Sequence, residues 1–144
     1  MLDLTSASIS DSEELNRLDK EIFNSHCYSN YSDILKDNKS LICLGKEDEK
    51  IVGYIYFNVV QDECELYHVG VDEDYRGRHI SSKLLSYSLN ILKERGVSRV
   101  FLEVRQNNKI AIKLYENYGF KRYNTRTNYY GNGVDAYCYV MEVR

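Results

Sequence analysis

The strongest constraint on the fold is a stretch in which two apolar runs are separated by a charged turn and an amphipathic helix. Residues 63–71 (ECELYHVGV) and 97–104 (VSRVFLEV) are both typical of β-strands. Between them, apolar residues recur at helical spacing up to a terminating glycine, Gly96: Ile80, Leu84, Leu85, Leu89 and Leu92. Strands joined through a helical crossover pair in parallel. The stretch therefore predicts an α/β fold with parallel pairing between 63–71 and 97–104.

The rest of the chain supplies further strands and helices in the order β-α-α-β-β-β-α-β-α-β-β. Besides an N-terminal strand, the expected elements are helices at 10–23, 32–38 and 107–119, a hairpin at 40–60 around the charged turn 46–50, and strands at 120–130 and 135–143 joined by a Gly-Asn-Gly turn. With 144 residues and no linker or repeat, we expect one domain over residues 1–144. Its fold class is α/β, with a mixed, mostly antiparallel sheet of about seven strands flanked by about four helices.

Composition is that of an ordinary globular protein, with 43% hydrophobic and 28% charged residues. No apolar run is long enough to span a membrane, and residues 1–18 do not resemble a signal peptide, so we expect no membrane partner and a cytoplasmic location. The cysteines Cys27, Cys43, Cys64 and Cys138 are scattered and are interpreted as buried free thiols. The three histidines show no ligand spacing, so no metal site is predicted.

Charge is distributed unevenly along the chain. Residues 1–66 contain 14 acidic and 6 basic residues, whereas residues 67–144 contain 8 acidic and 13 basic residues. The acidic half suits a cationic substrate and the basic half suits a phosphate-bearing ligand, although ordinary solvated surface would look the same. Because the basic residues form no long stripe and the net charge is −3, direct binding of nucleic acid is not expected.

The turn between the strand at 63–71 and the following helix carries Arg76, Arg78 and His79. Cations are unfavourable at a helix N-terminus, which already bears a partial positive charge, unless an anion binds there. A strand, a tight basic turn and a helix N-terminus together suit a phosphate group, because free N–H groups point at it. Neither the P-loop pattern nor the dinucleotide-binding pattern G-x-G-x-x-G is present, so we do not expect an NTPase or a Rossmann unit.

These residues resemble the GCN5-related N-acetyltransferase (GNAT) superfamily, whose pyrophosphate loop follows the pattern [QR]-x-x-G-x-[GA]. Arg76 occupies the first position of that pattern, and His79 and Ser81 stand where the family has its glycines. A second signature of the family, Asn-x-x-Ala-x-x-Leu-Tyr-x-x-x-Gly-Phe, is matched by Asn108, Ala111, Leu114, Tyr115, Gly119 and Phe120. The resemblance covers residues 50–144 well and implies the GNAT fold.

The resemblance also implies acetyl-CoA as cofactor. The residues that it places around coenzyme A are Val69, Gly70, Val71, Arg76, Gly77, Arg78, His79, Ile80, Ser81, Ser82 and Asn108. His79 adds bulk where the backbone approaches the pyrophosphate, but its ring could donate a hydrogen bond. Asn108 suits a plain N-cap as well as a cofactor contact. We expect cofactor binding to survive these departures, weakened at most.

Two residues are candidates for catalysis. Acetyl transfer to an amine needs a base for the amine and an acid for the departing thiolate. Glu103, in the apolar run 97–104, corresponds to the family's base; a glutamate near a strand end is, from the sequence alone, more often a solvated or salt-bridged residue. Tyr115 corresponds to the family's acid; from helical spacing alone it would be a core aromatic residue. An N–H at or near Val71 could polarise the thioester oxygen.

Within the superfamily the chain is most similar to the RimI-type enzymes, which acetylate the N-terminal alanine of a ribosomal protein. The similarity lies in LEVR at 102–105, NYY at 128–130 and the C-terminal segment. It implies that Tyr129 and Tyr130 line the acceptor groove, although packing would explain them equally well. Tyr28, a third candidate for the acceptor site, lies in Cys-Tyr-Ser, where RimI-type enzymes have Pro-Trp-Ser.

The function expected from the resemblance is therefore acetylation of a primary amine, most simply the N-terminal α-amine of a protein such as a ribosomal protein. Because the Pro-Trp-Ser element is missing, acetylation of a small amine such as a polyamine or an aminoglycoside remains an alternative. Because His79 and Ser81 replace the glycines of the loop, a non-catalytic acyl-CoA-binding module is another alternative.

Overall fold

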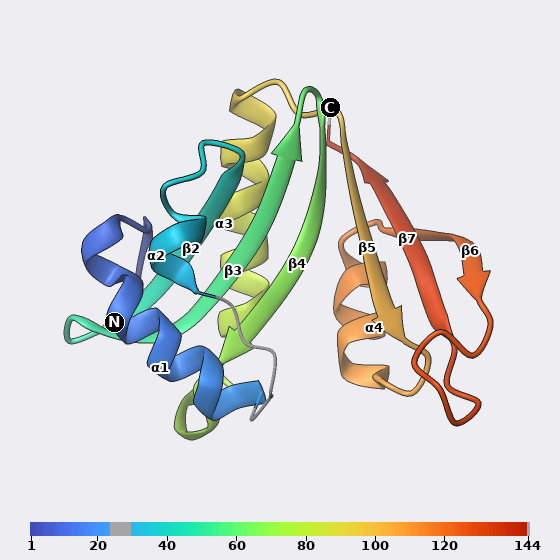
Figure 1. Cartoon of the computed structure of the whole chain (residues 1–144), viewed down its shortest axis with the longest axis horizontal. Coiled ribbons are helices and arrows are strands. Elements are labelled where there is room, and N and C mark those ends of the chain that lie inside the picture. Colours follow the sequence, from blue (N-terminus) through green and yellow to red (C-terminus); the bar gives the residue numbers. More distant parts are fainter. Residues whose placement is uncertain (24–29, 144) are drawn as a thin grey trace.

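The computed structural model describes residues 1–23 and 30–143 of the chain. It is a mixed α/β structure in which four helices surround a seven-stranded sheet (Figure 1). The helices are α1 (Ser12–Phe23), α2 (Tyr31–Ile34), α3 (Ile80–Glu94) and α4 (Lys109–Asn117). The strands are β1 (Asp3–Ser6), β2 (Ser40–Glu47), β3 (Lys50–Val60), β4 (Glu63–Val71), β5 (Arg99–Arg105), β6 (Lys121–Arg126) and β7 (Ala136–Glu142). This confirms the predicted order of elements.

The sheet consists of two antiparallel parts joined by one parallel contact. Its strand order is β1-β2-β3-β4-β5-β7-β6, and every neighbouring pair except β4 and β5 is antiparallel. The β2–β3 hairpin turns at Asp48 and Glu49, whose φ angles are 49° and 66°, so both lie in the left-handed region that a tight hairpin turn requires. The parallel contact between β4 and β5 is the one that the helical crossover predicts.

Each face of the sheet is covered by its own pair of helices (Figure 1). On one face, Leu15 and Leu18 of α1 and Tyr31 of α2 pack on a buried cluster from β2 and β3. On the other face, the apolar stripe of α3 packs on a larger core that also contains Tyr115 of α4. The stripe forms because Leu84, Leu85 and Leu92 recur at helical spacing and each is 1% exposed or less.

The segment after β6 differs from the prediction. A strand was expected to continue to residue 130, but β6 ends at Arg126 and residues 127–135 form a loop. Asn128, Gly131, Asn132 and Gly133 of this loop have φ angles between 54° and 82°, which an extended strand cannot accommodate. The Asn128 side chain accepts a hydrogen bond from the Gly133 N–H at 2.7 Å, which closes the loop. Tyr129 and Tyr130 therefore lie on a loop rather than on a strand.

Cys43, Cys64 and Cys138 are free and buried, as expected; Cys27 lies outside the described residues. None of the helices in the described ranges combines the length and apolarity needed to cross a membrane.

Candidate active site

The central feature of the candidate site is the divergence of β4 from β5. The two strands pair only through Glu63–Arg99, Cys64–Val100 and Glu65–Phe101. Beyond these pairs, β4 runs on to Val71 and β5 to Arg105 without pairing with each other, and Figure 1 shows them moving apart. The backbone of Val69, Gly70 and Val71 therefore borders an interruption in the sheet, and the sequence gives no signal for where pairing stops.

Gly70 also has a packing reason to be glycine. A Cβ atom at this position would lie 2.7 Å from the Tyr54 ring and 3.0 Å from the Ile22 side chain. A side chain there would push β3 and α1 away from β4. Packing against α1 therefore requires glycine at this position, independently of any ligand.

The basic turn, residues 76–79, lies directly before α3 and is separated from the end of β4 by a short 3-10 helix, Glu73–Tyr75. Gly77 and His79 both have left-handed backbones, with φ angles of 79° and 62°. A Cβ atom at Gly77 would meet nothing within 4 Å, so the surface there is open. Arg76, Arg78 and His79 are exposed, and the turn ends at the first residue of α3, Ile80, which is buried.

The first turn of α3 presents free amide groups to this open surface. The first intrahelical hydrogen bond is donated by the Lys83 N–H to the His79 carbonyl, so the amides of Ile80, Ser81 and Ser82 have no acceptor within the helix. The Arg76 Nε–H donates to the Val71 carbonyl at 3.2 Å, and the Arg78 guanidinium lies 5.0 Å from the centre of the Tyr75 ring. The free amides and the exposed cations therefore lie within one short segment, where the sequence predicts a phosphate.

Ser82 makes a contact that the sequence analysis missed. Its hydroxyl and its carbonyl oxygen each lie 2.9 Å from the Tyr118 hydroxyl. Tyr118 follows α4, so this contact joins the start of α3 to the end of α4. Nothing in the pattern of the sequence distinguishes Tyr118 from the other aromatic residues of its helix.

Asn108 and Tyr115 are both placed by α4. The Asn108 side chain accepts a hydrogen bond from the Ala111 N–H at 3.2 Å, which is the N-cap role, one of the two that the sequence left open. Tyr115 is 7% exposed and packs edge-on against Phe120, with 5.6 Å between the ring centres. Burial raises the pKa of the Tyr115 phenol to about 12, so the hydroxyl keeps its proton throughout the neutral range.

Glu103 lies on the opposite face of the sheet from Tyr115. Along β5, Val100, Leu102 and Val104 join the core that contains Tyr115, so the alternating residue Glu103 faces the other way. Its Oε2 lies 2.8 Å from the Nε of Arg126, and the Cys138 Sγ lies 3.7 Å from the same oxygen. The sequence left open whether Glu103 is salt-bridged; in the structure it is.

A pocket of about 270 Å³ opens beside Glu103, and its wall includes Glu65, Phe101, Tyr123 and Arg126. Glu65 also lines this pocket; it was not singled out from the sequence, and in the structure it is an exposed residue. Partial desolvation in the pocket wall raises the pKa of the Glu65 carboxyl, the negative charge of Glu103 raises it further, and Arg126 opposes the shift.

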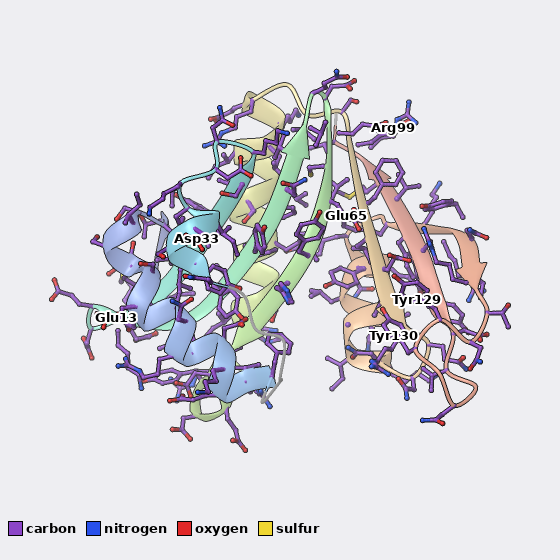
Figure 2. The ribbon with its side chains drawn as sticks, in the orientation of Figure 1. Glu13, Asp33, Glu65, Arg99, Tyr129 and Tyr130 are labelled. Carbon is purple, nitrogen blue, oxygen red and sulfur yellow. The ribbon has the colours of Figure 1, made fainter. Side chains whose placement is uncertain are left out.

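Two of the predicted acceptor residues, Tyr129 and Tyr130, lie towards the end of the sheet at which β4 and β5 have separated. Tyr129 and Tyr130 lie beside β7, away from Glu65, which is nearer the paired end (Figure 2). Their rings pack edge-on at 5.1 Å, with the Arg126 guanidinium 5.5 Å from the centre of the Tyr129 ring. Tyr28 lies outside the described residues.

Comparison with known proteins places this geometry in a family. Residues 9–120 match the model of the Acetyltransferase (GNAT) family. The [ribosomal protein bS18]-alanine N-acetyltransferase of Haemophilus ducreyi is 38% identical over 84 residues, which cover 58% of this chain and 58% of that protein. The N-alpha-acetyltransferase 30 of Schizosaccharomyces pombe is 38% identical over 73 residues, covering 51% of this chain and 49% of its own. The chain thus spans just over half the length of the first of these relatives and about half that of the second.

A solved structure agrees over the whole length of the chain. The crystal structure of the ribosomal-protein-S18-alanine N-acetyltransferase from Escherichia coli has a TM-score of 0.88 at 26% identity and covers 99% of this chain and 94% of that one. The family match extends over most of the chain, from the first helix to the end of the segment that carries Tyr115, and the fold agrees with it. The chain belongs to the GNAT family of acetyltransferases.

Proposed function

We propose that this chain is an acetyl-CoA-dependent N-acetyltransferase whose acceptor is the N-terminal α-amine of a protein; two of its relatives are named [ribosomal protein bS18]-alanine N-acetyltransferase and N-alpha-acetyltransferase 30. The observation that carries the proposal is the gap that opens where β4 and β5 diverge. The basic N-terminus of α3 lies on one side of this gap, and the two candidate proton-transfer groups, Glu103 and Tyr115, lie on the other. The two side chains lie on opposite faces of the sheet, so an acceptor and a donor could approach the same gap from opposite sides.

The residues around the basic turn fit coenzyme A. Its diphosphate would accept hydrogen bonds from the free amides of Ile80, Ser81 and Ser82 and would neutralise Arg76 and Arg78. The open surface at Gly77 leaves room for the backbone to approach a phosphate. The remaining predicted contacts are Val69, Gly70 and Val71 at the end of β4, His79 in the basic turn, and Asn108 at the start of α4. When bound, acetyl-CoA supplies an acetyl group activated as a thioester.

Glu103 is proposed as the base. The free α-amine has a pKa near 8, so a carboxylate, acting directly or through a water molecule, needs to remove only one proton to leave a nucleophile. The amine nitrogen then forms a bond to the acetyl carbon while the carbon–sulfur bond breaks. The ion pair with Arg126 keeps the carboxylate in the wall of the pocket where the amine would arrive.

Tyr115 is proposed as the acid. The departing thiolate takes a proton, and the Tyr115 phenol is a donor on the face that carries α3 and α4. Its burial keeps the hydroxyl protonated, since the pKa is raised to about 12. A backbone N–H near Val71 would polarise the acetyl oxygen during the same step.

The acceptor is proposed to enter past Tyr129 and Tyr130. Tyr129 is 52% exposed, which leaves its ring available to a peptide beside the pocket that contains Glu103. A protein N-terminus such as that of a ribosomal protein fits this arrangement, because it is extended and ends in the amine that Glu103 would deprotonate. Tyr28 stays a predicted acceptor contact.

The proposal is tested by incubating the protein with acetyl-CoA and three kinds of acceptor: peptides with a free N-terminal alanine, the same peptides blocked at the N-terminus, and polyamines or aminoglycosides. Mass spectrometry then locates any added acetyl group. We expect acetylation of the free α-amine alone, lost in Glu103→Gln. Acetylation of the small amines alone would instead favour the small-molecule enzyme. Calorimetric binding of acetyl-CoA without any transfer would favour a non-catalytic module.

A further inference from the structure

Arg126 contacts Glu103 across an intervening strand. In the sheet β7 lies between β5 and β6, with Cys138 of β7 directly opposite Glu103. The Arg126 side chain passes over this position to place its Nε 2.8 Å from the Glu103 Oε2. A thiol is small enough to leave that path open, and the Cys138 Sγ lies 3.7 Å from the same carboxylate oxygen.

A second contact holds the guanidinium on its other side. Its central carbon lies 5.5 Å from the centre of the Tyr129 ring, and Tyr129 packs edge-on against Tyr130. Arg105, two residues beyond Glu103 on β5, lies 4.2 Å from the centre of the Tyr130 ring. The carboxylate is thus connected, through Arg126, to the loop that is proposed to receive the acceptor.

The charges around Glu103 show why a fixed cation matters here. The titratable groups that face it are Glu65 from β4, Tyr123 and Arg126 from β6, Cys138 from β7 and Tyr130 from the loop. Glu63, Glu65 and Glu103 are like charges in the wall of one pocket, and Arg126 is the cation that the pocket wall contains. Without Arg126, the carboxylates would repel one another and Glu103 would favour a rotamer directed to solvent.

We propose that Arg126 is a positioning residue for Glu103: held against Tyr129, it keeps the carboxylate directed into the pocket where the acceptor amine arrives. This inference rests on the proposed role of Glu103 as the base. Arginine suits the task because its rigid, permanently charged fork keeps one geometry, which a flexible lysine does not.

The test compares Arg126→Met with Arg126→Lys and with Arg122→Met. Arg122 lies on the same strand and stacks on Tyr137 at 4.2 Å, so it is a matched control for loss of an arginine–tyrosine contact on β6. In Arg126→Met we expect kcat for the N-terminal peptide to fall by roughly 10- to 100-fold, the cost of a misdirected catalytic group. We expect KM for the peptide to change much less than kcat, and acetyl-CoA affinity to stay unchanged.

The other two variants separate positioning from structure. Arg126→Lys keeps the positive charge but not the planar fork, so it should recover part of the lost kcat. Arg122→Met should keep the wild-type kcat. A kcat in Arg126→Met equal to that of the wild type would overturn the inference, and so would a kcat in Arg126→Lys as low as that of Arg126→Met.

Failure of the underlying function would look different. If the wild-type protein transfers no acetyl group to any peptide, the proposed function itself fails, and with it the role assigned to Arg126. If the wild type is active and Glu103→Gln is not, while Arg126→Met matches the wild type, only the inference about Arg126 fails.

Discussion

The hydroxyl of Tyr118 lies 2.9 Å from both the hydroxyl and the carbonyl oxygen of Ser82. Because β4 and β5 have separated at this end of the sheet, no strand pairing holds the two halves together here. The contact between the end of α4 and the start of α3 therefore connects the two borders of the proposed cofactor site.

Removing this contact should cost stability. Tyr118→Phe deletes both hydrogen bonds, and we expect it to lower the free energy of unfolding by about 1 kcal/mol. Ser82→Ala should cost less, because the tyrosine can still donate to the carbonyl. Urea denaturation of both variants measures the difference. A Ser82→Ala variant less stable than Tyr118→Phe would show that the bond to the carbonyl does not contribute.

His79 stands in a left-handed conformation where the family has glycine. The φ angle of 62° is unfavourable for residues with a Cβ atom, and glycine adopts it freely. We therefore expect His79→Gly to be more stable than His79→Ala by about 1 kcal/mol in urea denaturation. Equal stability of the two variants would mean that the turn relaxes to another conformation when the imidazole is removed.

Tyr115 should act as an acid without contributing to cofactor affinity. We expect Tyr115→Phe to lower kcat by about 100-fold, the usual scale for a lost proton donor. Titration with acetyl-CoA should give an unchanged Kd, because the ring and its packing on Phe120 remain. In the wild type, Tyr115 has a pKa of about 12, so its deprotonation should cause no loss of activity between about pH 6 and 9. Full activity in Tyr115→Phe would remove it from the mechanism.

Glu65 should destabilise the fold at neutral pH. Its pKa lies above the ordinary value of 4.5, so the unfolded chain loses this proton at lower pH than the folded one. The destabilisation by Glu65 is therefore absent at low pH, where its carboxyl is protonated in both the folded and the unfolded chain. It is complete at pH values above the pKa of Glu65 in the folded chain. Glu65→Gln should raise the melting temperature at about pH 8 and leave it nearly unchanged at about pH 3. An equal gain at both pH values would contradict this origin.

The order of strands and helices could be predicted from the sequence because local patterns determine it. The helical stripe of α3 and the strands on either side of it required a parallel contact, and the structure contains one between β4 and β5. How far that contact extends could not be predicted. A β4–β5 contact of three residue pairs and one of seven would give the same apolar pattern in the sequence. The number of pairs depends on how α3 and α4 pack beneath the strands.

The candidate site could be predicted only in part for the same reason. Glu103 and Tyr115 were found through a family signature, whereas Arg126 reaches Glu103 across β7, a neighbour relationship that no local pattern encodes. The loop at 127–135 shows the opposite case. Its Gly-Asn-Gly turn was predicted, but the β-prone Tyr129 and Tyr130 before it concealed that the strand ends at Arg126.

The central claim is that the gap between β4 and β5 brings an acetyl thioester to a protein N-terminus. The most direct measurement is the rate at which a peptide with a free N-terminal alanine gains one acetyl group, followed by mass spectrometry for the wild type and Glu103→Gln. We predict acetylation of the α-amine by the wild type, at least about 100-fold faster than by the variant. Equal rates for the two proteins, or no acetylated peptide from a wild type that binds acetyl-CoA, would contradict the account.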